Sequence, residues 1–185
     1  MKPGARAVGV AESYRGVEST LAGVVTRASR VVDGFAFGQA TVGGTDATDE
    51  VCGLLSTLSR EDVQYVLVAG IAPAWYNMLD LVAIQGHADR PVISVSFEES
   101  EGLEGALRRE FEDDALETRL ETYRRQPDRS RLVVNDETVY VRSVGLETGE
   151  ARDVVRAFTP EGGRPEPLRV ARLAARAADR WRAVS

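Results

Sequence analysis

The sequence contains little cysteine, histidine and lysine, and each shortage excludes a class of site. Its 185 residues include one cysteine, Cys52, and one histidine, His87. A single cysteine rules out an intramolecular disulfide framework and a multi-cysteine zinc site, and a single histidine leaves no histidine pair for a metal. Cys52 is expected to be a small apolar side chain on a helix, because no basic neighbour in the sequence would activate its thiol.

Long apolar runs are also missing. No stretch of roughly 18 apolar residues could span a bilayer, and no secretory signal pattern is present. We therefore expect a cytoplasmic protein without a membrane partner. The 43% hydrophobic composition is enough for one sizeable core, and no Ser/Gly-rich or charged linker divides the chain, so residues 1–185 are expected to form a single domain.

The charge balance is acidic, and lysine is nearly absent. Asp and Glu number 29 against 23 Lys and Arg, the net charge is −6, and Lys2 is the only lysine. Such a molecule repels phosphate backbones unless its arginines gather on one face. An acidic, lysine-poor surface suits a high-salt cytosol, where screening acts within about 3 Å at molar salt, so a halophilic source is our hypothesis.

The order of apolar runs predicts an α/β protein with a mixed sheet. Strands are expected at 5–10, 20–26, 30–42, 64–70, 92–95, 132–134 and 139–144, and helices at about 46–59, 78–86, 103–111, 115–123, 150–158 and from 168 onward. The first three strands form an antiparallel meander, and strands alternating with helices follow, which implies parallel pairing. This element order is typical of a ribonuclease H-like fold, although the pattern alone supports only a mixed α/β sheet.

Four stretches carry a resemblance to a known family. They read VGVAES at 8–13, VDG and TVGGTDAT at 32–34 and 41–48, VAGI at 68–71, and PEPLRVA at 165–171. In this order and at these separations they resemble the domain of unknown function 99 family, an uncharacterised and largely archaeal family similar to endonuclease V. The resemblance covers nearly the whole chain and implies an endonuclease V-like, ribonuclease H-like fold.

The same resemblance shows a departure at the expected nuclease site. In endonuclease V two strand-end aspartates and a glutamate at a helix start converge on a divalent metal, because Mg²⁺ prefers oxygen ligands. Where relatives read GIDDS this chain has Ala11, and where they read LDG it has Ala69. Methyl groups cannot bind metal. The resemblance therefore implies that the metal-dependent nuclease site has been lost and that no cofactor is needed.

Two carboxylates remain candidates for that site. Glu12 is displaced by one residue, and on a strand this turns its side chain to the opposite face of the sheet. Asp46 falls near the glutamate position, but an aspartate at a helix start commonly caps free N–H groups, which is worth about 0.5–2 kcal/mol without any ligand. The lysine that follows the fifth strand in endonuclease V has no counterpart at 94–97.

Ligand-binding candidates lie in the loop at 70–77 and on the last helix. The loop leaves the carboxyl end of a central strand, where α/β sheets place ligand crevices. Trp75 and Tyr76 could stack on a flat ligand or pack against the protein, and Asn77 completes the set. Arg169 leads a series on the last helix, continued by Arg172, Arg176 and Arg180. These side chains form either a solvated face or a ridge that contacts phosphate.

Three functions remain open from the sequence. The leading hypothesis is a non-catalytic protein that binds nucleic acid or a protein through a crevice near Trp75 and Tyr76. The second is a Mg²⁺-dependent endonuclease whose site is rebuilt from Glu12, Asp33, Asp46 and Asp80, which needs three carboxyl groups within about 4–5 Å of one point. The third is a structural subunit that forms a homodimer through the last helix or the aromatic loop.

Overall fold

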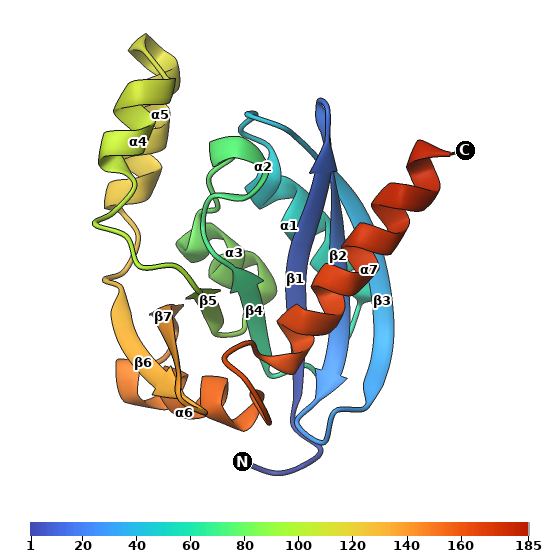
Figure 1. The fold of residues 1–185 in the computed structure, drawn as a ribbon. Coiled ribbons are helices and arrows are strands. Elements are labelled where there is room, and N and C mark those ends of the chain that lie inside the picture. Colours follow the sequence, from blue (N-terminus) through green and yellow to red (C-terminus); the bar gives the residue numbers. More distant parts are fainter. Residues whose placement is uncertain (185) are drawn as a thin grey trace.

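The strands of the computed structural model, which describes residues 1–184, form one seven-stranded mixed sheet (Figure 1). In chain order they are β1 (Arg6–Arg15), β2 (Glu18–Arg27), β3 (Val32–Thr41), β4 (Tyr65–Ala69), β5 (Val92–Ser96), β6 (Ser130–Val134) and β7 (Glu137–Val144). Their order across the sheet is β3-β2-β1-β4-β5-β7-β6.

The pairing of these strands confirms the predicted fold class. β1, β2 and β3 pair antiparallel as a meander, and β1–β4 and β4–β5 pair parallel. β7 pairs antiparallel with both β5 and β6. In the parallel pair β1–β4, Val10 lies opposite Val68, so Ala11 and Ala69 follow side by side at the carboxyl ends of two adjacent strands.

Helices cover both faces of the sheet. They are α1 (Ala47–Leu58), α2 (Pro73–Tyr76), α3 (Leu81–Ala88), α4 (Glu104–Glu110), α5 (Asp113–Arg124), α6 (Thr148–Ala157) and α7 (Glu166–Ala183). Figure 1 shows α7 crossing β1 and β2 on one face, while α1 and α3 lie on the other. Among the described residues, no helix is long and apolar enough to cross a membrane.

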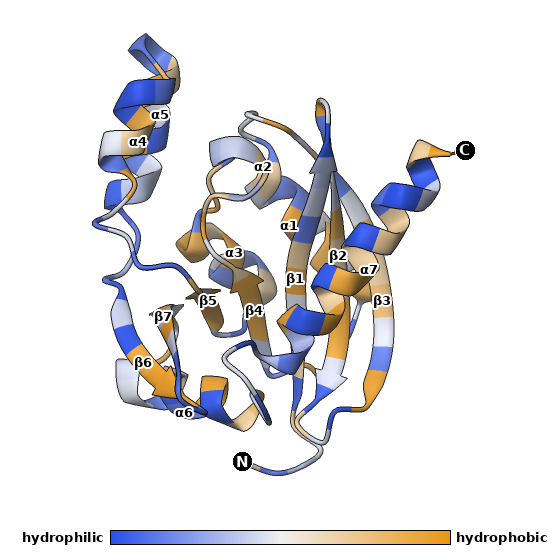
Figure 2. Cartoon of the chain, in the orientation of Figure 1, coloured by the Kyte–Doolittle hydropathy of each residue, from blue (hydrophilic) through white to orange (hydrophobic). Residues whose placement is uncertain are grey.

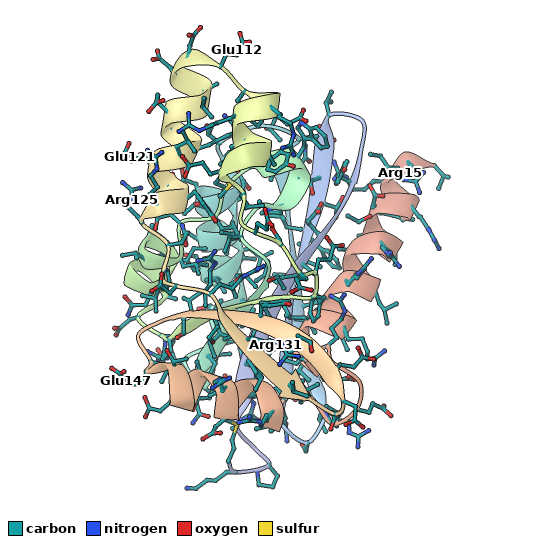
Figure 3. The ribbon with its side chains drawn as sticks, turned by 60° about the vertical axis from the view of Figure 1, so that its left-hand side comes forward. Arg15, Glu112, Glu121, Arg125, Arg131 and Glu147 are labelled. Carbon is teal, nitrogen blue, oxygen red and sulfur yellow. The ribbon has the colours of Figure 1, made fainter. Side chains whose placement is uncertain are left out.

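Alternation along β1 sorts its side chains between the two layers. Val8 and Val10 join the core beneath α1 and α3, whereas Ala7 and Ala11 face the layer that contains α6 and α7. Figure 2 shows the apolar residues concentrated on the central strands, with hydrophilic residues along α4 and α5. Charged side chains such as Glu112, Glu121 and Arg125 project outward from the α5 region in Figure 3.

One glycine lets α7 approach β1 closely. A Cβ at Gly9 would lie 2.3 Å from both the carbonyl carbon and the oxygen of Pro167, at the first turn of α7. Only a residue without a side chain allows these two backbones to pack at this distance. The contact fixes the path of α7 over the carboxyl half of β1, where the candidate site lies.

The elements differ from the sequence prediction in two places that matter for the site. β1 extends to Arg15, because its antiparallel register with β2 continues through Glu12 and its polar neighbours beyond the predicted end at residue 10. The short helix α2 contains left-handed residues at Ala74 and Trp75, and Tyr76 also has a positive φ of 57°. Three consecutive non-glycine residues with positive φ form a strained turn.

Candidate functional site

A crevice lies at the carboxyl ends of β1, β4 and β5, beside α7. Its volume is about 450 Å³. The lining residues come from the three strand ends, the loop before α7 and α7 itself: Ala11, Glu12, Ser13, Tyr14, Ala69, Gly70, Val95, Ser96, Phe97, Glu98, Arg164, Arg172 and Arg176. The carboxyl ends of parallel strands are where open α/β sheets commonly bind ligands, so this crevice is the main candidate site.

Ala11 and Ala69 lie on the α7 side of the crevice. Ala11 is buried against Val24 and Ala171, and Ala69 packs partly buried against the same cluster. These are the positions to which the family resemblance assigns the two nuclease aspartates. Each offers only a methyl group there, and neither can donate an oxygen to a metal ion.

Glu12 and Ala11 face opposite sides of the sheet. Glu12 pairs across the sheet with Leu21, whose side chain belongs to the core on the α1 side, so Glu12 points to the face opposite Ala11. Its Oε2 accepts a hydrogen bond from the Ser19 hydroxyl at 2.6 Å. Glu12 therefore reaches the rim of the crevice from the other face of the sheet.

Three arginines line the side of the crevice nearest α7. Arg172 and Arg176 lie one turn apart on α7, and Arg164 comes from the loop between α6 and α7. The Arg164 guanidinium stacks 3.7 Å from the centre of the Phe97 ring. Burial, together with the nearby positive charges of Arg172 and Arg176, lowers the pKa of Arg164.

These arginines differ from others on the same side of the molecule. Within residues 1–184, none of the three makes an ion pair or a hydrogen bond. Sequence reasoning placed Arg172 and Arg176 in a ridge but overlooked Arg164. The available signal was the Gly162–Gly163 break, which brings the chain back across the strand ends before Pro165.

Arg169, the fourth predicted ligand-binding residue, lies outside this crevice. Its guanidinium forms two hydrogen bonds of 2.7 Å with the Glu166 carboxylate, one turn earlier on α7. This pairing raises the pKa of Arg169 and lowers that of Glu166. The predicted ridge is therefore divided: Arg169 is paired, Arg172 and Arg176 line the crevice, and Arg180 is exposed outside it.

Asp46 is held by side chains and backbone of the neighbouring loop. Its carboxylate accepts hydrogen bonds from the Thr41 N–H at 3.0 Å, the Thr41 hydroxyl at 2.7 Å and the Asn77 amide at 2.6 Å. Burial opposes ionisation, but these bonds bring the pKa of Asp46 below its ordinary value. The prediction that Asp46 caps α1 through its side chain is wrong, because its oxygens face Thr41 and Asn77 and it makes no capping bond.

Asn77 supplies the contact at the start of α1. It is fully buried, its Oδ1 accepts from the Ala47 N–H at 2.9 Å, and its Nδ2 donates to the Thr41 carbonyl at 2.8 Å. The prediction of Asn77 as a ligand-binding residue does not fit this placement, since both ends of its amide are engaged inside the protein. Asn77 instead joins the loop after β4 to the loop before α1.

Trp75 and Tyr76 form a projecting aromatic pair. Trp75 is 48% exposed, and its ring centre lies 5.3 Å from that of Tyr76. The ring centre of Tyr76 lies 6.1 Å from that of Phe111. Trp75 does not line the crevice. The loop begins in the crevice at Gly70 and carries Trp75 away toward Gly43.

Buried Arg119 stabilises this aromatic turn. From α5 it donates to the carbonyls of Tyr76 at 3.0 Å, Gly43 at 2.6 Å and Gly44 at 3.0 Å. Burial lowers the pKa of Arg119, whose guanidinium also lies 3.8 Å from the centre of the Phe111 ring. The turn is thus held in its left-handed conformation by contacts from an element distant in the chain.

The four carboxylates of a rebuilt nuclease site lie in separate surroundings. Asp33 pairs with Arg6 and Arg27, which hold its pKa at about 2. Asp80 caps α3 through the N–H groups of residues 82 and 83 and pairs with Arg125. Among residues 1–184, no group of three or more His, Cys, Asp and Glu side chains is arranged to hold a metal ion.

Comparison with known proteins relates this architecture to a family. Residues 3–179 match the family model described as endonuclease dU. A UPF0215 protein of Pyrobaculum aerophilum is 35% identical over 173 residues, which cover 91% of each chain. A crystal structure of a protein of unknown function from Archaeoglobus fulgidus superposes with a TM-score of 0.83 at 25% identity, covering 94% of this chain and 98% of that one.

The fold also matches that of endonuclease V. The Ciona intestinalis enzyme, crystallised with a 24mer DNA that contains an inosine followed by a ribo-adenosine, has a TM-score of 0.65 at 12% identity. The match covers 96% of this chain and 87% of that chain. At this identity the similarity shows a shared endonuclease V-like fold.

Proposed function

We propose, from the premise that this chain belongs to the endonuclease dU family, that it is a member without nuclease activity that binds single-stranded nucleic acid. The observation that carries the proposal is the pair of methyl groups, Ala11 and Ala69, side by side at the ends of β1 and β4. Family membership supports the scaffold, and these two residues support the loss of catalysis.

The chemistry of phosphodiester cleavage explains why this pair is decisive. A metal ion must activate water and stabilise the leaving oxygen, and carboxylate oxygens must hold that ion in place. The Ala11 and Ala69 side chains offer no such oxygen. The four candidate carboxylates have other partners: Glu12 bonds Ser19, Asp33 pairs with arginines, Asp46 bonds Thr41 and Asn77, and Asp80 caps a helix. The crevice thus retains a binding shape without the groups that would hold a catalytic metal.

Nucleic acid is a better ligand for this site than a protein partner. The Ciona intestinalis endonuclease V was crystallised with DNA on the same fold. The present crevice carries three arginines, and the exposed Trp75 projects from the loop that starts there. Guanidinium groups bind phosphates, and exposed aromatic rings stack on bases. Within the predicted ligand set, Trp75 and Arg169 remain accessible, and Tyr76 supports the Trp75 ring.

The test of the lost nuclease site is a metal titration. Mg²⁺ and Mn²⁺ are titrated into the purified protein by calorimetry in high salt, the setting that the acidic, lysine-poor composition supports. The double variant Ala11→Asp/Ala69→Asp is the matched control, because it adds a carboxylate at each strand end to the two glutamates, Glu12 and Glu98, already in the crevice lining. We expect saturable heat from this variant and none attributable to the crevice in the wild type.

Cleavage assays accompany the titration. Inosine- and deoxyuridine-containing DNA, and inosine-containing RNA, are incubated with wild type and metal. Intact substrate together with retention of the labelled strand by the protein supports the proposal. Metal-dependent cleavage by the wild type would instead establish the alternative of a rebuilt endonuclease. Light scattering of the free protein tests the structural-subunit alternative, for which a stable homodimer that retains no strand is the expected result.

A further inference from the structure

We propose that Arg164, Arg172 and Arg176 form a metal-free phosphate-binding site, in which guanidinium groups hold a backbone phosphodiester. The inference rests on the proposed function where it names a nucleic-acid strand as the ligand. It goes further by assigning the residues that contact the phosphate and by predicting that no metal ion takes part.

The three side chains converge from two elements. Arg172 and Arg176 are four residues apart, so they lie on the same face of α7. Arg164 reaches the crevice from the preceding loop and stacks on Phe97, which follows β5. Stacking restrains the guanidinium plane, so less freedom is lost when it binds an anion.

The charges in this group are uncompensated within the described chain. On the same side of the molecule, Arg169 pairs with Glu166, Arg15 with Asp179, and Arg182 with Glu18. The three crevice arginines have no such partner within residues 1–184, and their mutual proximity contributes to the lowered pKa of Arg164. Three gathered cations repel one another until an anion binds between them, which favours a phosphate ligand.

The two carboxylates that line the crevice do not neutralise it. Glu12 approaches from the opposite face of β1 with one oxygen bonded to Ser19, and Glu98 is an exposed residue two positions after the end of β5. The lining therefore contains three arginines and two glutamates, with the arginines together on one side. An anion placed against Arg164, Arg172 and Arg176 meets positive charge.

Ala11 and Ala69 are compatible with direct phosphate binding in the crevice. Aspartates at these strand ends would add two negative charges to the crevice and repel a phosphate unless a metal ion lay between them. Methyl groups remove that repulsion. The arginine fork also matches phosphate geometry with two parallel hydrogen bonds. Replacement of the carboxylates thus converts a position suited to a cation into one that accepts an anion directly.

Binding of a fluorescent oligothymidylate, followed by anisotropy over a salt series with a chelator present, tests the site. The crevice variant is Arg172→Gln/Arg176→Gln. The matched control is Arg109→Gln/Arg131→Gln, which removes the same charge from exposed positions on other elements, outside the crevice. We expect the crevice variant to bind at least about tenfold more weakly than wild type. The slope of log affinity against log salt concentration should fall in magnitude by about 1.4, since each lost phosphate contact contributes about 0.7 for single strands.

A strand with the same bases and an uncharged backbone separates phosphate contact from base contact. Wild type and the crevice variant should bind this uncharged strand with equal affinity. Equal losses in the crevice and control variants, or undiminished binding by the crevice variant, would overturn the site. These outcomes are distinct from failure of the proposed function, which is either metal-dependent cleavage by the wild type or no binding of the oligothymidylate by the wild type. Arginine-dependent binding with cleavage would leave the phosphate site standing and reject only the non-catalytic assignment.

Discussion

Asp33 shows how a carboxylate can be strongly perturbed without belonging to a catalytic site. Arg27 and Arg6 donate to its Oδ2 at 2.7 Å each, and Arg27 also donates to Oδ1 at 2.9 Å. These bonds stabilise the ionised form and lower its pKa from 3.8 to about 2. A perturbed pKa commonly marks a functional site, but here the carboxylate pairs with arginines in a structural network that joins β1, β2 and β3.

The pH dependence of stability follows from this shift. Because the folded-state pKa is depressed, the ionised Asp33 stabilises the protein fully above about 3.8, and that contribution disappears as the pH falls toward 2. Asp33→Asn should therefore lower the Tm at neutral pH, and its difference from wild type should shrink as the pH falls through this window. Circular dichroism melts at several pH values measure it. Asp89→Asn, at a side chain that is 97% exposed, is the control and should change the Tm little.

Trp75 lies in a strained backbone conformation, and a role in stacking on a ligand would explain why the strain is retained. Its φ of 57° and ψ of 69° are left-handed, which an L-residue adopts at a cost of about 1–2 kcal/mol. We predict that Trp75→Gly is more stable than Trp75→Ala by about 1 kcal/mol, since only glycine relieves the strain. Both variants should bind the oligothymidylate more weakly than wild type. Urea unfolding and anisotropy measure the two effects, and equal stability of the two variants would show that the turn is unstrained.

At the scale of elements, the contact between α7 and β1 depends on one missing side chain. Gly9→Ala places a Cβ 2.3 Å from Pro167 backbone atoms, which cannot rotate away. Overpacking of this kind costs about 1–3 kcal/mol, and we expect the upper end because backbone must move. Gly53→Ala in α1 is the matched control, since its Cβ meets open space, and helix propensity predicts a gain of about 0.5–1 kcal/mol. Denaturant unfolding measures the change in the free energy of unfolding for both variants. No change for Gly9→Ala would mean that α7 can shift to accommodate the Cβ.

Element prediction from the sequence succeeded where apolar periodicity is local. The buried runs of β4 and β5 and the amphipathic stripe of α7 followed directly from residue order. The side-chain partners did not follow, because some join distant positions and others are local pairs that replace a larger pattern. Asn77 reaches the start of α1 from 30 residues away, and the pairing of Arg169 with Glu166 competes with a ridge that spacing alone predicts. Arg164 was missed because a loop residue has no periodicity.

Across the whole molecule, positive side chains gather at one place although the chain as a whole is negatively charged. The chain has a net charge of −6, yet three arginines that have no carboxylate partner within residues 1–184 gather near the carboxyl ends of the central strands. A second hollow shares Ala69, Gly70, Ser96 and Glu98 with the crevice and carries Arg129 and Arg142 on its other side. Positive side chains therefore occur on both sides of the strand ends, while the acidic remainder of the surface repels a phosphate backbone.

This distribution predicts how affinity depends on strand length. Oligothymidylates of increasing length should bind more tightly until one strand spans both hollows, because each added phosphate meets further arginine charge. Beyond that length, affinity should rise only by the statistical gain of extra binding registers, since additional phosphates would face acidic surface. Anisotropy at fixed salt measures the series. The variant Arg172→Gln/Arg176→Gln should reach its plateau at a shorter length than wild type, whereas a continuous rise in both proteins would indicate a binding surface that extends well beyond the strand ends.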